Sequence, residues 1–352
     1  MTGDFDRVVE LVERRGGAAQ LCVVSRGEIV LERAIACSPD ALFLIYSASK
    51  PFVALLVHLL AERDMLSLDD PVAAHWPEFG QRGKQAITVR HVLQHRAGVP
   101  VAGNMLATVL HLTDWDRSVR DAERARPRWP PGAVPAYHSM TYGFILGELV
   151  QRVAGVPVRD FLASELLAPL GLDDIHLGLA DKHWPRHVPV RAVGHPRDLI
   201  NQVLSNSRRF RQAVIPSASI STTAHQLARF YQMLLRGGEL DGMRVLNEHT
   251  VGEAVCPSTN GEIDALIKRP VGWAQGFQIG GPGHDPRDVR RMIGGSSGTS
   301  ETFGHAGAAS CTAWADPSLD LVFIYLSSVQ PTIDDGIRHL GEVSDALRAV
   351  FA

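Results

Sequence analysis

A serine and a lysine three residues apart open a mostly apolar segment of the chain. Ser47-Ala48-Ser49-Lys50 precedes residues 51–60, in which His58 is the only polar side chain. This pattern predicts a helix over residues 45–63. Side chains three apart on a helix lie on the same face, one turn apart, so Ser47 and Lys50 are expected to be neighbours. The segment therefore constrains the fold to include an apolar helix with a lysine in its first turn.

The pair has a chemical interpretation and a structural one. A serine is a poor nucleophile until its proton is removed, and a desolvated lysine amine can remove it. Ser47 at a helix N-terminus would also have free N–H groups for a developing oxyanion. A short S-x-x-K pattern is more often an exposed, solvated pair on a helix. The chain has only four lysines against thirty-one arginines, and a structural cation in an apolar stretch is costly, which favours a nucleophile and base.

Composition excludes several classes of function. The 352 residues can form one large domain or two, and 45% hydrophobic with 21% charged residues is typical of a soluble globular protein. A net charge of −3 predicts neither nucleic-acid binding nor an anionic membrane partner. No apolar run reaches the length of a membrane span, and the N-terminus lacks a secretory pattern. Four scattered cysteines without a C-x-x-C pair indicate reduced thiols, so we expect a cytoplasmic protein. The oligomeric state cannot be predicted from these features.

Periodicity predicts strands at both ends of the chain and helices between them. Helices are expected over 6–15, 45–63, 91–95, 142–153, 223–237 and 337–351, strands over 20–25, 28–34, 272–279, 302–307, 310–315 and 319–327, and an irregular surface excursion over 180–212. This order predicts an α+β fold whose sheet is built from both termini, with a helical insertion. We expect a single domain, 1–352, with an α/β subdomain of residues 1–62 and 212–352 and a helical subdomain of residues 63–211.

Two further motifs follow the first in a fixed order. Tyr137-His138-Ser139 comes after a proline-rich loop, and His305-Ala306-Gly307 lies in a predicted strand. With Ser47-x-x-Lys50, they resemble the three signatures of the serine β-lactamase and penicillin-binding family, specifically its class C-like esterase branch. The resemblance extends from Phe43 to Leu326. It implies a β-lactamase-like antiparallel sheet flanked by helices, with the active site in the cleft beside an inserted helical subdomain.

The resemblance also implies roles for individual residues. Ser47 would be the acylated nucleophile, and Lys50 and Tyr137 would share the task of general base, with a nearby ammonium lowering the pKa of the phenol. The N–H groups of Ser47 and Ala308 would form the oxyanion hole. Ser139, His305 and Gly307 would bind substrate. No cofactor and no metal are expected. Taken singly, Tyr137 could be an ordinary core tyrosine and His305 an ordinary strand residue.

Two departures from the family pattern bear on the substrate. Ser139 replaces the asparagine, and His305 replaces the lysine, of β-lactamases and transpeptidases. Both changes weaken recognition of a substrate carboxylate or amide, because a histidine is mostly neutral near pH 7. We therefore expect a serine hydrolase acting on a small carboxylic ester. An acyltransferase, a β-lactamase or D-amino-acid peptidase, and a catalytically silent binding protein remain as alternatives.

Two other patterns resemble known motifs only in part. Gly294-Gly295-Ser296-Ser297-Gly298 fits G-x-S-x-G, but it lacks the preceding strand and following helix that this motif requires. His91 and His95 have the spacing of a zinc-binding helix without its glutamate. We interpret the first as a surface loop and the two histidines as helix and cap residues.

Overall fold

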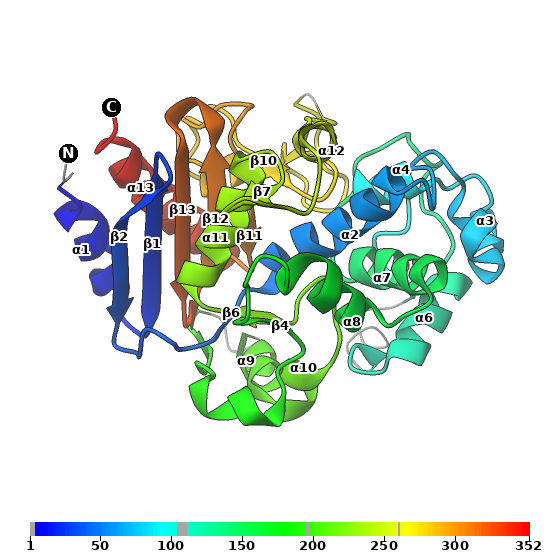
Figure 1. The fold of residues 1–352 in the computed structure, drawn as a ribbon, viewed down its shortest axis with the longest axis horizontal. Coiled ribbons are helices and arrows are strands. Elements are labelled where there is room, and N and C mark those ends of the chain that lie inside the picture. The colour runs from blue at the N-terminus through cyan, green and yellow to red at the C-terminus, as the bar shows by residue number, and fades with distance from the viewer. Residues whose placement is uncertain (1–3, 104–110, 195–197, 260) are drawn as a thin grey trace.

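An antiparallel sheet of seven strands forms one side of the molecule (Figure 1). The computed structural model describes residues 4–103, 111–194, 198–259 and 261–352. The strand order is β2-β1-β13-β12-β11-β10-β9. Their bounds are β1 Ala19–Ser25, β2 Glu28–Ile35, β9 Gly272–Trp273, β10 Gln278–Ile279, β11 Phe303–Gly307, β12 Cys311–Asp316 and β13 Leu321–Ser327.

The sheet joins the two ends of the chain. β1 pairs antiparallel with β13, with Ala19 opposite Ser327, and with β2 on its other side. The predicted hairpin between β1 and β2 is confirmed, and its turn uses positive φ at Arg26 (51°) and Gly27 (87°). The predicted α+β fold, with an antiparallel sheet built from both termini and flanked by helices, is confirmed.

Helices cover both faces of this sheet. On one face, α1 (Asp6–Arg15) and α13 (Ile333–Arg348) pack on a cluster that contains Trp314, Phe323 and Tyr325. On the other face, α11 (Ala224–Leu235) contacts β1, β12 and β13. Fully burying one large apolar side chain contributes about 1.5–3 kcal/mol, so these two layers hold the sheet rigid beneath the site.

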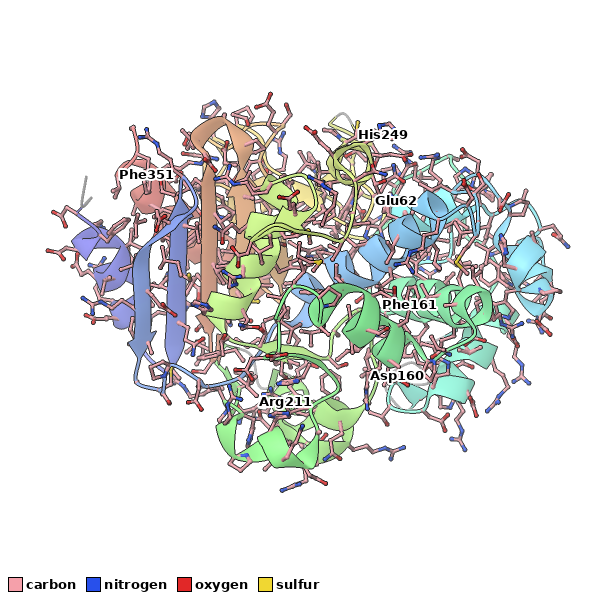
Figure 2. All side chains as sticks on the ribbon, in the orientation of Figure 1. Glu62, Asp160, Phe161, Arg211, His249 and Phe351 are labelled. Atoms are coloured by element: carbon pink, nitrogen blue, oxygen red, sulfur yellow. The ribbon has the colours of Figure 1, made fainter. Side chains whose placement is uncertain are left out.

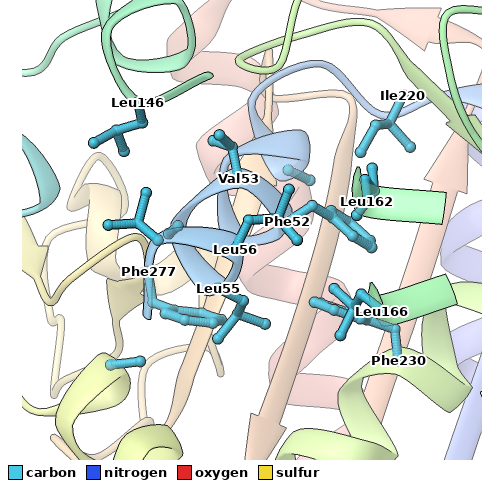
Figure 3. Packing of buried hydrophobic residues seen from close by; sticks show 14 of the residues in the cluster. Phe52, Val53, Leu55, Leu56, Leu146, Leu162, Leu166, Ile220, Phe230 and Phe277 are labelled. Carbon is cyan, nitrogen blue, oxygen red and sulfur yellow. The ribbon is translucent and has the colours of Figure 1, made fainter. Parts of the chain in front are cut away.

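The central helix α2 (Lys50–Glu62) runs through the main hydrophobic core, with every residue from Lys50 to Leu60 buried (Figure 3). It packs against α7 (Thr141–Ala154), and Phe52 stacks on Phe230 of α11 with ring centroids 4.0 Å apart. The expected helix over 45–63 is confirmed with one refinement. Its first turn, Tyr46–Ser49, is a separate 3₁₀ turn, so Ser47 precedes α2 and Lys50 is the first residue of α2.

The remaining elements surround α2 and the lower end of the sheet. The helices are α3 Val72–His75, α4 Val89–Leu93, α6 Trp115–Arg124, α8 Val158–Leu162, α9 Asp198–Asn206, α10 Arg208–Gln212 and α12 Glu248–Val255. Short 3₁₀ or π segments are Pro77–Gly80, Ala163–Leu167, Asp181–Arg186, Val289–Met292 and Pro317–Leu319. Three minor sheets pair β3 Phe43–Leu44 and β4 Ile175–Leu177 with β6 Ile220–Thr222, β5 Arg191–Ala192 with β14 Val329–Gln330, and β7 Glu239–Leu240 with β8 Met243–Arg244.

Two predictions of local structure were wrong. The segment 180–212 contains helices α9 and α10 instead of an irregular excursion. Leu199, Ile200, Val203 and Leu204 do form an apolar stripe on α9, but the helix has only nine residues and lies in a segment rich in Arg, His and Pro, so the pattern was overlooked. The expected strand 272–279 is a hairpin of β9 and β10, because Gly276 has φ +105° and a side chain there would lie 2.2 Å from the Cβ of Ala54.

None of the helices in the described residues is long and apolar enough to cross a membrane.

Candidate active site

The turn before α2 presents Ser47 to a cavity. Its neighbour Tyr46 has φ +47°, a left-handed conformation that is strained for a tyrosine. Such strain persists only where surrounding structure imposes it, and it is concentrated at functional sites. Here β3 and β6 hold the turn, because the Ile45 amide donates to the Ile220 carbonyl at 3.0 Å. Ser47 is therefore fixed by the sheet strand that leads into it.

Lys50 lies directly behind Ser47. Its side chain is 0% exposed, and its Nζ donates to Ser47 Oγ and to the Ser217 carbonyl, both at 3.3 Å. No salt bridge involves Lys50 in the described part of the chain. Burial without a counter-charge lowers the pKa of Lys50 well below its ordinary value. The lowered pKa favours the neutral amine, the form of Lys50 that can accept a proton.

Tyr137 contacts Ser47 from the opposite side. Its hydroxyl donates to Ser47 Oγ at 2.6 Å, and the Lys50 Nζ lies 4.8 Å from the centre of its ring. Burial raises the pKa of Tyr137 above its ordinary value. This is opposite to the expected lowering of the phenol pKa by a nearby ammonium, because desolvation of the buried phenol is the largest effect on its pKa. Tyr137 therefore remains a phenol that can relay a proton.

Aromatic rings fix the position of Tyr137. Trp273 stacks on it with centroids 5.2 Å apart and planes 5° apart, and His95 packs edge-on at 5.1 Å. The Trp273 indole N–H donates to buried Asp264 at 3.0 Å, which fixes the tryptophan ring. The His95 ring accepts from the His138 amide at 3.2 Å. His91 lies in α4, and His95 follows its C-cap with φ +58° and donates its amide to the Val92 carbonyl, which agrees with the interpretation of the two histidines as helix and cap residues.

Sequence reasoning missed three of these supporting residues. The Ser217 carbonyl accepts a hydrogen bond from Lys50. The Ser217 hydroxyl accepts from the Gly143 amide at 2.7 Å and donates to the Met140 carbonyl at 3.2 Å. Trp273 and Asp264 hold the tyrosine. None of the three belongs to a motif or a regular spacing with Ser47. A buried Gly-Trp pair in a predicted strand is the only signal that the sequence offers for Trp273.

The turn after β11 lies beside the turn that contains Ser47. Ala308 and Ala309 have φ +47° and +55°, and the Ser310 amide donates to the Gly307 carbonyl at 2.9 Å. Positive φ at both central residues is a type I′ feature that usually selects glycine or asparagine. Within the described residues, neither the Ser47 nor the Ala308 N–H donates to another protein group. Both N–H groups therefore remain available for an oxyanion.

The other predicted residues of β11 have different surroundings. His305 is buried, its Nδ1 bonds the Ala306 carbonyl at 2.7 Å, and its Nε2 has no protein partner. Burial lowers the pKa of His305 to about 3, so it carries no charge at neutral pH. A side chain at Gly307 would lie 2.0 Å from the Ile45 carbonyl oxygen. Gly307 therefore permits close packing against the nucleophile turn, and it does not line the cavity.

A cavity of about 600 Å³ opens in front of Ser47. It is lined by Ser47, Tyr137, Ser139, His305 and Ala308, together with a mostly apolar set that includes residues of α9 and α13. None of the described residues that line it is Lys, Arg, Asp or Glu. The structure thus brings Ser47, Lys50 and Tyr137 into contact, and it places Ser139, His305 and Ala308 around the same space.

One group of metal-binding residue types lies away from this cavity. Asp174, His176 and His183 lie within ligand distance of one another among the described residues. Both carboxylate oxygens of Asp174, however, accept from the Arg186 guanidinium at 2.7 Å. The group therefore gives no basis for a metal site.

Comparison with known proteins agrees with the geometry. The Beta-lactamase family model matches residues 5–348 of the chain. The chain belongs to the beta-lactamase family. The esterase/beta-lactamase LipL of Mycobacterium tuberculosis is 31% identical over 349 residues, which cover 88% of this chain and 76% of LipL.

Two solved structures have the same fold over nearly the whole chain. A penicillin-binding protein homologue from Caulobacter crescentus superposes with a TM-score of 0.82 at 28% identity, covering 98% of this chain and 97% of its own. EstA from Arthrobacter nitroguajacolicus Rue61a superposes with a TM-score of 0.82 at 26% identity, covering 99% of this chain and 96% of EstA. The predicted family and fold are therefore confirmed.

Buried histidines around the site predict loss of stability in acid. Burial lowers the pKa of His58 to about 4 and those of His138 and His305 to about 3, so the unfolded chain binds more protons below about pH 6.5. The free energy of unfolding is therefore expected to fall, by about 1.4 kcal/mol per pH unit for each histidine, between pH 6.5 and 4. Urea unfolding at several pH values measures this slope. His58→Phe should reduce this slope by the contribution of one histidine. An unchanged slope in that variant would contradict the lowered pKa of His58.

Proposed function

We propose that this protein is a serine hydrolase that cleaves carboxylic esters through an acyl-Ser47 intermediate. The observation that carries the proposal is the position of Ser47 Oγ, 2.6 Å from the Tyr137 hydroxyl and 3.3 Å from the Lys50 amine at the edge of an apolar cavity. Membership of the beta-lactamase family and relatives named esterases, including EstB of Burkholderia gladioli, support it.

The geometry supports the following sequence of proton transfers. The neutral Lys50 amine accepts the Ser47 proton as Oγ attacks the ester carbonyl. The resulting oxyanion receives hydrogen bonds from the N–H groups of Ser47 and Ala308. Tyr137 donates its phenol proton to the leaving alcohol and regains a proton from Lys50, which leaves the acyl group on Ser47. Water then attacks the acyl carbon by the reverse relay, and the acid departs.

The cavity favours uncharged substrates. Its described lining holds no formal charge, and neutral His305 stands where relatives with a lysine would have a cation. A carboxylate in this cavity would lose its hydration without a cationic partner. We therefore propose neutral small-molecule esters as the substrate class, with Ser139 and His305 Nε2 as hydrogen-bonding groups at the cavity wall.

A pair of matched esters tests this specificity. We expect kcat/KM for mono-p-nitrophenyl succinate to be about ten- to a hundredfold lower than for p-nitrophenyl butyrate, because the two share a leaving group and differ mainly by a carboxylate. Spectrophotometric initial rates at neutral pH measure both. Equal values would show that the site accommodates a carboxylate and would return the β-lactamase alternative to first place.

Covalent labelling tests the nucleophile. A fluorophosphonate should add once per chain, and peptide mass spectrometry should map the adduct to Ser47. Ser296, the serine of the G-x-S-x-G pattern, instead donates its hydroxyl to the Asp345 carboxylate at 2.9 Å, and that carboxylate is also bound by Arg291 at 2.9 Å. An adduct on Ser296 or Ser297 would overturn the proposal.

The proposal also includes a subdomain division and a cellular location. We retain the division into an α/β subdomain (residues 1–62 and 212–352) and a helical subdomain (residues 63–211), supported by the grouping of α3, α4, α6, α7 and α8 beside the sheet domain in Figure 1. We also propose a cytoplasmic location, supported by the four free cysteines, none of which forms a disulfide within the described residues.

A further inference from the structure

Helix α9 exposes large apolar side chains to solvent. Leu199, Ile200 and Val203 are 54%, 63% and 69% exposed. Their spacing places them on one face of the helix, because residues three and four apart are neighbours on a helix surface. A contiguous exposed apolar face on a folded protein marks an interaction surface more often than a structural feature. The exposed face of α9 therefore requires a partner.

The other sides of α9 are already occupied. Gln202 accepts from the Ala192 amide at 2.8 Å, and Asn206 pairs with the amide and carbonyl of Val190, both at 2.8 Å, which anchors the helix to the neighbouring segment. On the side away from the exposed face, Asn201, Leu204 and Ser205 line the cavity in front of Ser47. Helix α9 is thus a wall with the cavity on one side and solvent on the other.

A further exposed apolar residue lies at the edge of the cavity. Ile333, at the start of α13, is 60% exposed and also lines the cavity. The strand β14 that precedes α13 pairs with β5, which lies next to α9 in the chain. The exposed apolar surface of α9 and the entrance to the cavity therefore belong to one continuous region of the molecule.

This region is also basic. The described residues 180–194 and 198–212 contain six Lys or Arg against two Asp, although the whole chain has a net charge of −3; of these six, Arg211 is buried and Arg186 is paired with Asp174. Lys182, Arg191 and Arg209 are exposed, and none of them has a carboxylate partner among the described residues. Arg208 is paired with Asp181. Figure 2 shows this region, with Arg211 labelled, as the lower part of the molecule. The net charge of the whole chain therefore does not reveal this local basic surface.

We propose that the exposed face of α9 docks on an anionic lipid surface, from which lipophilic esters enter the cavity past α9 and Ile333. The proposal rests on the proposed esterase function. Exposed apolar side chains on a helix, with Lys or Arg nearby, hold a helix at an anionic interface. Here the cations lie on the elements that contact α9, Arg191 on β5 and Arg209 on α10. The basic charge favours this occupant over a second copy of the chain, because two such faces would repel each other.

Vesicle co-sedimentation tests the docking without using catalysis. We expect the wild-type chain to sediment with phosphatidylcholine/phosphatidylglycerol vesicles, and much less with pure phosphatidylcholine or at high salt. Leu199→Gln/Ile200→Gln/Val203→Gln should reduce binding about tenfold or more, because three buried apolar contacts are lost. The matched control Ile29→Gln/Met65→Gln/Met243→Gln replaces three exposed apolar residues elsewhere and should bind within about twofold of wild type.

Each outcome has one meaning. Wild-type protein that cleaves p-nitrophenyl butyrate but does not sediment, or an α9 variant that sediments like wild type, overturns the docking and leaves the esterase function intact. A wild-type dimer in sedimentation velocity that the α9 variant abolishes also overturns it, because the face would then bind a second copy. Sedimentation by a protein that lacks esterase activity supports the docking and overturns the proposed function instead.

Discussion

Ser47→Ala is expected to lower kcat/KM for p-nitrophenyl butyrate by about four to six orders of magnitude, the usual effect of removing a nucleophile that acts within a catalytic unit. Nothing else in the described site can replace it, because Ser139 and the other cavity serines have no contact with Lys50. The variant should fold normally, since the hydroxyl contributes only the bonds to Lys50 and Tyr137. Initial rates and circular dichroism measure both effects.

A matched serine supplies the control. Ser296→Ala removes the serine of the G-x-S-x-G pattern, which lies on the loop held by Asp345. It should leave the rate within about twofold of wild type, the range of a substitution away from the chemistry. If Ser47→Ala retained more than about a tenth of the activity, another nucleophile would be responsible.

Lys50→Met and Tyr137→Phe should each lower kcat by about two to four orders of magnitude, the usual contribution of a general acid or base. Methionine keeps the length of the lysine stem in the core, and phenylalanine keeps the stack on Trp273. Lys50→Met should raise the free energy of unfolding, because the variant no longer buries an amine that lacks a counter-charge. Chemical denaturation separates this gain from the loss of rate.

The double variant distinguishes a shared relay from two independent groups. If Lys50 and Tyr137 act on one proton path through Ser47, the double variant should be at most about tenfold slower than the slower single variant. Single-turnover rates in all four proteins complete the cycle. Fully additive losses would contradict the relay, and a Tyr137→Phe variant near wild-type rate would remove Tyr137 from the mechanism.

The sequence predicted the parts of the fold that repeat a local pattern. The hairpin of β1 and β2, the apolar α2 and the capped α11 each contain their own periodicity or turn signal, and each was confirmed. Helix α9 was missed because its apolar stripe spans only nine residues within a segment whose many Arg, His and Pro residues suggested an irregular loop. The hairpin of β9 and β10 was missed because the turn depends on Ala54 of α2, which lies far away in the chain.

The same distinction applies to the site. Ser47 and Lys50 are one helical turn apart, so their proximity follows from the sequence. Tyr137 could be assigned to the same site only through the resemblance to a family. Trp273 and Ser217 could not have been found, because their contacts with Tyr137 and Lys50 arise from packing between segments that share no spacing. Their roles, like those of the motif residues, remain predictions until variants are measured.

The pairing of β1 with β13 has a consequence for the order of events during synthesis. The first strand of the sheet can pair with β2 at once, but its second partner, Leu321–Ser327, comes nearly the whole chain later. Contacts of such sequence separation close late, because the intervening chain must first be brought together. His305 and Ala308 lie just before that last strand. We therefore expect a nascent chain that already contains Ser47, Lys50 and Tyr137 to lack a complete site until the C-terminal strands emerge.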